Sequence, residues 1–492
     1  MKKQTKILAT LGPSSQSVDT IVQMIRAGAN LFRLNFSHGT HEYHKQMLDK
    51  VQKASEQCGL FVGILQDISG PKVRIGEVDG RLELESGDLL EFVRDDVIGS
   101  FIEPHRARVS LNQPVLLDRV EVDQMIFLAD GSLRTKVISK DSNTVICEVQ
   151  NSATITSKKG VNFPQTVLGL DVLTQKDRDD MAWGVKHGVD FMAISFVQSA
   201  KDMQDARDHL SSLGGTQQLV AKIEKFDAVE NIDSILKLSD AIMVARGDLG
   251  IEIPYFKVPT VQKMLIKKAN EAHKPVITAT QMLLSMTSSE RATRAEISDV
   301  ANAVLDGTDC VMLSEESAVG EYPIKSVVAM THTIVEIEKI YPHYKLSTFT
   351  NNDEMDAINE SAVLMSKRIN AKAILAITSS GQSAKKLSRY RPKKPILAVT
   401  HDIVTARSLT LVWGVAPAFL TLTDSVDEML IEVIQSGIAR GVLDKNSSYI
   451  LTAGDPVGVP GTTNTIKILR KNEIEYFASA TLKQCTQEMP RG

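Results

Sequence analysis

The chain has few cysteines, few aromatic residues and no long apolar run. Its four cysteines, among 492 residues, lie far apart and include no CxxC pair, which argues against a disulfide framework and indicates reduced thiols. The apolar run after MKKQTK ends at Gly12-Pro13, too early for a signal peptide. No later run reaches the ~18 apolar residues that a membrane span needs. We therefore expect a cytoplasmic protein without a membrane partner.

The chain also lacks a strong excess of either charge. Its formal net charge is −4 and its isoelectric point is ≈ 6.2. This balance gives no general attraction to nucleic acid or to anionic membranes, so local groups must hold any anionic ligand. At roughly 100–150 residues per domain the length suggests about three domains, or fewer if one is an α/β barrel.

Short apolar runs alternate with longer amphipathic segments such as 17–29 and 298–309. Eight runs are read as strands: 6–12, 30–37, 61–67, 190–196, 219–224, 241–248, 275–281 and 310–316. Alternation of strand and helix favours parallel pairing, and eight units are what a (β/α)8 barrel requires. Its active site is expected at the C-terminal ends of the strands.

The alternation of strand and helix is interrupted once, by an inserted segment, and the barrel is followed by a separate domain. Residues 71–171 are rich in Val, Gly and Asp turns and predict a small all-β domain, inserted after the third strand as a lid over the barrel mouth. The barrel itself is expected over 1–70 and 172–345. A polar linker then leads to a C-terminal α/β open-sheet domain over 346–492, with strands in KAILAIT, KPILAVT, GVAPAFL and SYILTAG.

Polar residues gather where the predicted barrel strands end. In LFRLNFSHG, Arg33, Asn35 and Ser37 alternate with apolar residues, so their side chains leave one face together. Other strand ends contribute Asp67, Lys222, Glu224, Arg246, Asp248, Thr278 and Thr280. Their concentration on one rim predicts a functional site.

Glu224 and Asp248 end neighbouring strands and offer two carboxylates to one divalent ion. Magnesium suits this set, because it prefers hard oxygens and usually takes only one or two protein carboxylates. Lys222 lies two residues before Glu224, so both face the same side, where a buried lysine needs a negative partner or a role in charge stabilisation. A purely structural lysine–carboxylate pair is the alternative. Gly247 lets a ligand approach the backbone at the start of a helix.

The residues of LFRLNFSHG, together with Asp67, are suited to binding phosphate and a cation. Arg33 offers a planar fork for phosphate oxygens, and Asn35, Ser37 and Asp67 offer oxygens suited to a monovalent cation. A rim that holds phosphate and cations is equipped for phosphoryl transfer, in which positioning and charge neutralisation do most of the work. The alternative for Arg33 is an exposed arginine on a solvated strand end.

Several of these segments resemble the pyruvate kinase family. The resemblance runs in order over essentially the whole chain. It is carried by LNFSHG (34–39), ISGPKVRIG (68–76), SKKGVN (157–162), KIE (222–224), MVARGDLG (243–250), ITATQML (277–283), TRAEISDVANAVLDGTD (293–309) and MLSEES (312–317).

The resemblance implies transfer of the phosphoryl group of phosphoenolpyruvate to ADP, followed by protonation of the enolate to pyruvate. Glu224 and Asp248 are similar to the family's magnesium ligands, with Mn²⁺ as an alternative ion. Lys222 is similar to the lysine that stabilises the developing charge and Arg33 to the phosphate clamp. Thr280 is similar to the threonine near the substrate carboxylate and the protonation step. The backbone at 246–248 would receive that carboxylate. The family usually forms a homotetramer.

The resemblance also implies a nucleotide side formed by His38, Arg74 and Lys159. Many members have glutamate at the position of Lys72 and use potassium bound by residues similar to Asn35, Ser37 and Asp67. Here Lys72 brings a fixed ammonium beside that site, which predicts activity without potassium; the alternative is that Lys72 points to solvent. Glu315 and Ser317 replace the frequent Gly and Thr, but the shared Glu316 is kept.

The segment TSSGQSAKK (378–386) follows a predicted strand of the last domain and opens a helix. Hydroxyls, a glycine and a helix N-terminus can bind an anion, and the position is similar to the family's effector-phosphate loop. The residues concerned are Thr378, Ser379, Ser380, Gly381 and Ser383, with GTTNT (461–465) beside them. A sugar phosphate and a nucleotide monophosphate both fit. A serine-rich helix cap is the alternative.

Two other functions stay open at this point. One is a magnesium-dependent barrel that acts on an enolpyruvate without a nucleotide, such as an aldolase or mutase. It would not need Arg74, Lys159 or a lid of this size. The other is a sugar-phosphate sensor without catalysis, for which loss of Lys222, Glu224, Asp248 or Thr280 would be expected; all four are present.

Overall fold

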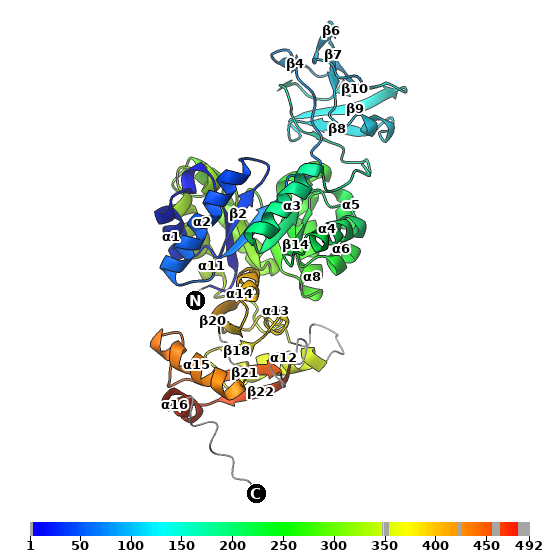
Figure 1. The fold of residues 1–492 in the computed structure, drawn as a ribbon. Coiled ribbons are helices and arrows are strands. Elements are labelled where there is room, and N and C mark those ends of the chain that lie inside the picture. Colours follow the sequence, from blue (N-terminus) through cyan, green and yellow to red (C-terminus); the bar gives the residue numbers. More distant parts are fainter. Residues whose placement is uncertain (1–2, 347, 349–353, 421–424, 455–462, 481–492) are drawn as a thin grey trace.

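The computed structural model describes residues 3–346, 348, 354–420, 425–454 and 463–480. Three bodies follow one another along its long axis: a β domain, a barrel and a C-terminal α/β domain (Figure 1). We retain 71–171 and 346–492 as the proposed limits of the first and the last.

The middle body is a closed barrel of parallel strands. Around it run β1 (Lys6–Thr10), β2 (Leu31–Asn35), β3 (Gly63–Asp67), β13 (Phe191–Ile194), β14 (Gln218–Ile223), β15 (Ala241–Ala245), β16 (Val276–Ala279) and β17 (Cys310–Leu313), and β17 closes on β1. These strands are the apolar runs predicted from the sequence, so the barrel prediction is confirmed. Side chains such as Leu8, Leu65, Phe191 and Met243 fill the barrel interior.

Helices surround the barrel strands, and the longer ones turn an apolar face toward them. They are α1 (Val18–Ala27), α2 (His41–Cys58), α3 (Gln175–His187), α4 (Ala200–Ser212), α5 (Phe226–Glu230), α6 (Ile232–Leu238), α7 (Arg246–Glu252), α8 (Val258–Glu271), α9 (Arg294–Asp306), α10 (Glu315–Ala318) and α11 (Pro323–Ile337). Helix α9 shows how the sequence sets such bounds: Thr293 and Glu296 form a capping box, and Gly307 ends the helix with a φ of +103°.

The inserted body is all β, as predicted, and has its own core, which includes Phe92, Leu128 and Phe163. One sheet has the order β12-β8-β9-β10-β5-β7-β6, and a second pairs β11 with β4. The strands are β4 (Leu82–Leu84), β5 (Leu89–Val93), β6 (Ser100–Glu103), β7 (Arg106–Ser110), β8 (Met125–Leu128), β9 (Leu133–Lys140), β10 (Thr144–Val149), β11 (Ala153–Ile155) and β12 (Val161–Asn162). The chain enters this lid from the C-terminal end of β3, so the lid stands over that end of the barrel.

The C-terminal body is an open sheet with the order β20-β19-β18-β21-β22, in which only β22 is antiparallel to its neighbour. Its elements are α12 (Glu354–Arg368), β18 (Ile374–Ile377), α13 (Gln382–Arg389), β19 (Ile396–Thr400), α14 (Ile403–Ser408), β20 (Val415–Leu420), α15 (Val426–Ala439), β21 (Tyr449–Gly454), β22 (Thr463–Leu469) and α16 (Lys471–Ser479). The predicted open sheet is confirmed, but the edge strand β22 was not among the predicted strands.

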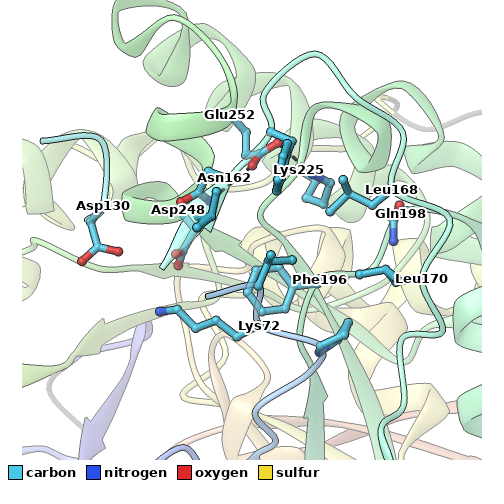
Figure 2. A pocket seen from close by; sticks show the side chains of 14 residues that line it. Lys72, Asp130, Asn162, Leu168, Leu170, Phe196, Gln198, Lys225, Asp248 and Glu252 are labelled. Atoms are coloured by element: carbon cyan, nitrogen blue, oxygen red, sulfur yellow. Dashed lines mark hydrogen bonds and ion pairs between the residues drawn. The ribbon is translucent and has the colours of Figure 1, made fainter. Parts of the chain in front are cut away.

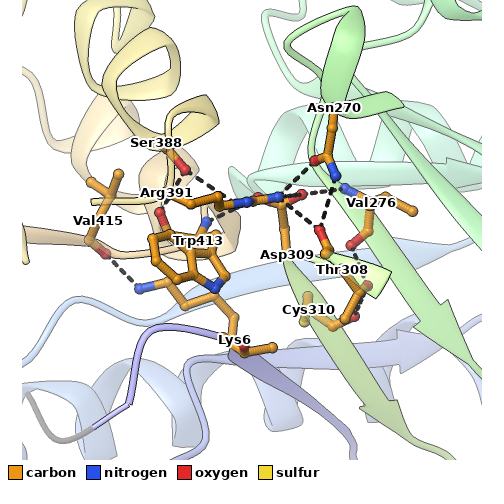
Figure 3. Close-up of polar contacts among 12 residues, drawn as sticks. Lys6, Asn270, Val276, Thr308, Asp309, Cys310, Ser388, Arg391, Trp413 and Val415 are labelled. Atoms are coloured by element: carbon orange, nitrogen blue, oxygen red, sulfur yellow. Dashed lines mark hydrogen bonds and ion pairs between the residues drawn. The ribbon is translucent and has the colours of Figure 1, made fainter. Parts of the chain in front are cut away.

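A buried polar cluster joins this domain to the barrel floor (Figure 3). The guanidinium of Arg391 donates to Asp309 at 2.9 Å, to Asn270 at 2.6 Å and to the Gly307 carbonyl at 2.7 Å. The Trp413 ring lies over that guanidinium, 4.9 Å from its carbon to the ring centroid. Because Asp309 directly precedes β17, the cluster lies at the N-terminal end of the strands, opposite the lid.

No helix in the described residues is long and apolar enough to cross a membrane.

Candidate active site

The structure brings the predicted rim residues together at the C-terminal end of the barrel. Arg33 and Asn35 lie in β2, Asp67 ends β3, and Lys222 lies near the end of β14. Glu224 follows β14, Asp248 lies in the first turn of α7 after β15, and Thr280 follows β16. The parallel register of the barrel therefore turns positions far apart in the sequence into one rim.

Lys222 is the centre of the charged cluster. Its ammonium lies 2.8 Å from Glu224 Oε1 and 3.2 Å from Asp67 Oδ1, and it donates to Ser195 Oγ at 2.7 Å. Burial alone would lower the pKa of Lys222, but the carboxylates of Asp67 and Glu224 outweigh it and hold this pKa above its usual value. The side chain is only 12% exposed, so a fixed positive charge faces the barrel mouth.

Arg33 is held in place rather than exposed. Its Nε lies 2.6 Å from Asp67 Oδ2, and its Nη1 donates to Thr10 Oγ1 at 3.2 Å. Burial would raise the pKa of Asp67, but Lys222 and Arg33 outweigh it and lower this pKa. Asp67 therefore stays ionised between two cations, and the outer part of the guanidinium remains available to an anionic ligand.

Glu224 and Asp248 form the candidate metal site. Glu224 is 2% exposed, and its Oε2 accepts a hydrogen bond from the Phe196 N–H at 2.8 Å. No hydrogen bond or ion pair in the described residues engages the Asp248 carboxylate. Burial and the Glu224 charge raise the pKa of Asp248 to about 6, although Lys222 and Lys72 act against this. The crowding of negative charge would be relieved by a cation.

Magnesium fits this donor set. In the part of the chain that the structure describes, no group of three or more His, Cys, Asp or Glu residues is placed to hold a metal ion. The Asp248 carboxylate has no partner among the described residues, and each Glu224 oxygen, although it already has one contact, keeps a second lone pair. Such a pair of carboxylates matches Mg²⁺, which keeps several waters and takes few protein ligands. Mn²⁺ accepts the same hard oxygen ligands.

Thr280 lies in a strained loop beside α7. Its φ is +69° and that of Gln281 is +56°, a region that residues with a Cβ seldom adopt. The Thr280 hydroxyl donates to the Ala279 carbonyl at 2.6 Å and accepts from the Gly247 N–H at 2.7 Å. Strain of about 1–3 kcal/mol per such residue is characteristic of functional sites, where the surrounding structure holds the conformation. The Gly247 N–H, expected to receive a carboxylate, is thus engaged with Thr280.

A cavity extends from this rim toward the lid (Figure 2). Its lining includes Lys72, Asp130 and Asn162 from the lid side and Asp248 from the barrel. The amine of Lys72 extends toward Asp130 and Asp248 (Figure 2). No hydrogen bond or ion pair in the described residues joins it to Asn35, Ser37 or Asp67. The charge of Lys72 acts instead on Asp248, whose pKa it lowers.

The remaining predicted ligands lie around the mouth, and all of them except the half-buried Asn35 are exposed. The Asn35 side chain accepts from the Ser37 N–H at 3.2 Å, and His38 follows on the same loop. Arg74 and Lys159 are both exposed at the base of the lid, where Arg74 forms a β-bridge with Gly160 and donates to the Lys158 carbonyl at 2.9 Å. These two basic residues therefore come from two segments at the base of the lid that an isolated β-bridge joins.

The loop before α13 is compact. Gly381 has a φ of +81° and donates its N–H to Thr378 Oγ1 at 2.9 Å, while the Ser379 carbonyl accepts from Thr405 at 3.0 Å. The Ser383 hydroxyl contacts that of Thr463 at the start of β22. The predicted proximity of 378–383 to GTTNT thus holds at Thr463; residues 461–462 lie outside the described residues.

Sequence reasoning missed two residues that hold the site. Ser195 receives the Lys222 ammonium and donates to the Ile68 carbonyl at 2.7 Å. Phe196, with a φ of +58°, turns its N–H onto Glu224. Both end the strand run DFMAISF, so their position at a barrel strand end was a usable signal, although a serine and a phenylalanine carry no charge to draw attention.

The chain is similar to known proteins over nearly its whole length. The family model "Pyruvate kinase, barrel domain" matches residues 2–327, and "Pyruvate kinase, alpha/beta domain" matches 356–469. A pyruvate kinase of Geobacillus stearothermophilus is 41% identical over 476 residues, which are 95% of this chain and 80% of that protein. One from Bacillus licheniformis is 42% identical over 474 residues, with the same coverage. The crystal structure of a Cryptosporidium parvum pyruvate kinase has a TM-score of 0.90 and 36% identity, covering 95% of this chain and 96% of that one.

Proposed function

Because this chain belongs to the pyruvate kinase family, and is by that relationship a phosphotransferase, we propose that its barrel rim converts phosphoenolpyruvate and ADP to pyruvate and ATP. The observation that carries this proposal is the pair of fixed cations, Lys222 and Arg33, held by one carboxylate, Asp67, at the mouth of the barrel. In the reaction the bond between phosphorus and the enol oxygen breaks, and a bond from phosphorus to an ADP β-phosphate oxygen forms. The enolate left behind takes a proton at its methylene carbon.

Lys222 and Arg33 are proposed to bind the phosphoryl group as it moves. Phosphoryl transfer depends on positioning and on charges fixed before the reaction, and both cations are already oriented by Asp67. Lys222 is also proposed to stabilise the charge that develops on the enolate oxygen. Its raised pKa keeps the ammonium charged at neutral pH.

Thr280 is proposed to position the proton donor for the enolate. Its hydroxyl donates to the Ala279 carbonyl and accepts from the Gly247 N–H, and these two contacts hold it beside α7. Delivery through a water bound at this hydroxyl is compatible with this geometry. The α7 backbone at 246–248 is proposed to lie against the substrate carboxylate.

Glu224 and Asp248 would hold Mg²⁺, or Mn²⁺ in its place, through their carboxylate oxygens. When bound, this ion neutralises the phosphate and enolate oxygens and orients them. His38, Arg74 and Lys159 are proposed to bind the nucleotide. Since two of the three belong to the lid, closure of the lid would complete the nucleotide site.

We further propose that the enzyme works without potassium, because Lys72 supplies a fixed positive charge near the substrate site. The support is its place in the cavity beside Asp248. The test compares the steady-state rate in potassium-free, sodium-free buffer with the rate after potassium is added. The unchanged protein should be equally fast in both, whereas Lys72→Glu should become potassium-dependent.

Lys237→Glu, an exposed residue of α6, is the matched control and should behave like the unchanged protein. Strong activation of the unchanged protein by potassium would contradict the role of Lys72 while leaving the kinase assignment in place.

Regulation is proposed to act through the loop 378–383, which would bind a phosphorylated effector with its hydroxyl and N–H groups. A homotetramer in the cytoplasm is the proposed assembly and location. Isothermal titration with a sugar phosphate and with a nucleotide monophosphate tests the loop, with Ser383→Ala as the variant. Absence of binding outside the barrel would refute this regulation.

Lys222→Met tests the catalytic assignment. Loss of one preorganised charge typically costs about 10²–10³-fold in kcat. The expected result is a loss of at least this size in ATP formation, with the Michaelis constant for ADP nearly unchanged because Lys222 lies on the substrate side. Lys237→Met is the control. A kcat within a factor of about two of the unchanged value would refute the assignment.

A further inference from the structure

A second ion pair lies directly behind the two metal-site carboxylates. Lys225 follows Glu224 in the chain, and Glu252 lies one helical turn after Asp248 on α7. The Lys225 ammonium lies 2.9 Å from Glu252 Oε2, and both side chains are 3% exposed. Figure 2 shows this pair beyond Asp248, along the wall of the same cavity.

The pair ties together the two segments that carry the metal-site carboxylates. Among the described residues, no other hydrogen bond or ion pair joins 224–230 to α7. The opposite flank of α7 is fixed separately, by Arg246 to Asp299 at 2.8 Å and to the Thr280 carbonyl at 2.8 Å. Without the pair, the end of β14 and the metal-site side of α7 would have no polar connection of their own.

The lid contacts the same pair. Asn162, the last residue of β12, donates from Nδ2 to Glu252 Oε1 at 3.3 Å. Glu252 therefore accepts a hydrogen bond from the barrel on one oxygen and from the lid on the other. A movement of the lid base that breaks the Asn162 contact would change the environment of the ion pair, and through it the spacing of Glu224 and Asp248.

We propose that Lys225 and Glu252 are positioning residues: their ion pair sets the separation of the Glu224 and Asp248 carboxylates for the divalent ion, and Asn162 couples that separation to the lid. This inference rests on the proposed function, because it takes those carboxylates as the metal ligands. Groups that orient metal ligands typically change metal affinity by about 10–100-fold when they are replaced.

The direction in which each of two single substitutions changes the affinity for a divalent cation distinguishes a positioning role from a purely electrostatic one. If the pair acted only through its charges, Lys225→Met would strengthen binding of a divalent cation and Glu252→Gln would weaken it. If the pair sets the geometry, both substitutions weaken binding, each by about tenfold or more. A pair that served stability alone would leave the affinity of the folded protein unchanged.

The experiment measures Mn²⁺ binding to the full chain without substrates, by electron paramagnetic resonance of the free ion. The unchanged protein should bind Mn²⁺, and Glu224→Gln should bind it much more weakly. If the unchanged protein fails to bind, or if Glu224→Gln binds equally well, the proposed metal site itself is wrong. Only after that arm succeeds do Lys225→Met and Glu252→Gln test the positioning.

Each single substitution leaves one buried charge unpaired and so risks the fold, which a double variant avoids. Lys225→Met with Glu252→Met removes both charges and replaces them with apolar side chains, which is often tolerated in stability. The inference predicts a folded double variant, by circular dichroism and melting temperature, whose Mn²⁺ affinity is still about tenfold lower. Recovery of the unchanged affinity, or opposite effects of the two single substitutions, would overturn it.

Hydrogen exchange tests the link to the lid. Mn²⁺ should increase amide protection in the peptide around β12 of the unchanged protein, and Asn162→Ala should abolish most of that increase. Asn143→Ala, at an exposed lid residue, is the matched control and should keep the full response. An equal response of Asn162→Ala and the unchanged protein would refute the coupling.

Discussion

Arg391→Met should loosen the C-terminal domain from the barrel. Arg391 is 1% exposed and Asp309 4%, so the substitution leaves a buried carboxylate without its cation. Among the described residues, the Asp309 carboxylate then keeps the backbone N–H groups of Val276, at 3.1 Å, and Trp413, at 3.2 Å. Removing one partner of a buried pair costs about 3–5 kcal/mol. If the free energy of unfolding falls by about 2–3 kcal/mol per molar urea, the urea concentration at the unfolding midpoint should fall by about 1–2.5 M.

The fluorescence of Trp413 reports this loss of stability at the joint between the C-terminal domain and the barrel. The chain has two tryptophans, Trp183 and Trp413, and the second lies over the Arg391 guanidinium. Urea titration in a Trp183→Phe background therefore follows the domain joint alone. The kcat at 25 °C should stay close to that of the unchanged protein, because the cluster lies at the end of the barrel opposite the site.

A surface ion pair provides the matched control. Lys339 and Glu336 form an exposed i,i+3 pair on the barrel, and Lys339→Met should change the free energy of unfolding by at most about 1 kcal/mol. An Arg391→Met midpoint no lower than that of the control would refute the view that the buried pair holds the domains together.

Two further predictions concern the barrel. Burial raises the pKa of Asp190 to about 7, despite the Arg407 guanidinium 3.1 Å away, so between about pH 4 and 7 the folded state binds a proton that the unfolded state releases. The stability that this group contributes is present below about pH 4 and is lost as the pH rises through 7. Asp190→Asn should therefore reduce the difference in melting temperature between pH 5 and pH 8. An unaltered difference would contradict this. Gly184→Ala would place a Cβ 2.0 Å from Gln66 Oε1. Calorimetry should therefore find a free energy of unfolding that is lower by about 1–3 kcal/mol. A stability equal to that of the unchanged protein would show that Gln66 can move aside.

The barrel and its rim were predictable because their signals are local. Each strand run and the helix after it are read within about twenty residues, and the parallel topology then places every strand end on one rim. Arg33, Lys222 and Thr280 could therefore be assigned to one site without knowledge of any contact. The edge strand β22 was missed because its N-terminal residues, Thr463 to Thr465, were interpreted as part of an effector pocket.

The contacts that hold the site could not be predicted in the same way. Ser195 and Lys222 are 27 residues apart, as are Lys225 and Glu252, and Arg391 lies 82 residues from Asp309. Nothing in the local sequence says which of many lysines and carboxylates will meet across the barrel. Lys72 illustrates the limit: the sequence places a charge near the site, but only the structure directs it toward Asp130 and Asp248.

The most direct test of the central claim is the stoichiometry of the reaction. The purified protein is mixed with phosphoenolpyruvate, ADP and Mg²⁺. ³¹P NMR spectroscopy follows the formation of ATP, and a separate assay follows pyruvate. Equal amounts of ATP and pyruvate, none without ADP, and a loss of at least about 10²-fold in Lys222→Met are the predicted results. Consumption of phosphoenolpyruvate without ADP, or no ATP under any condition in which Mn²⁺ binds, would contradict phosphoryl transfer at this rim.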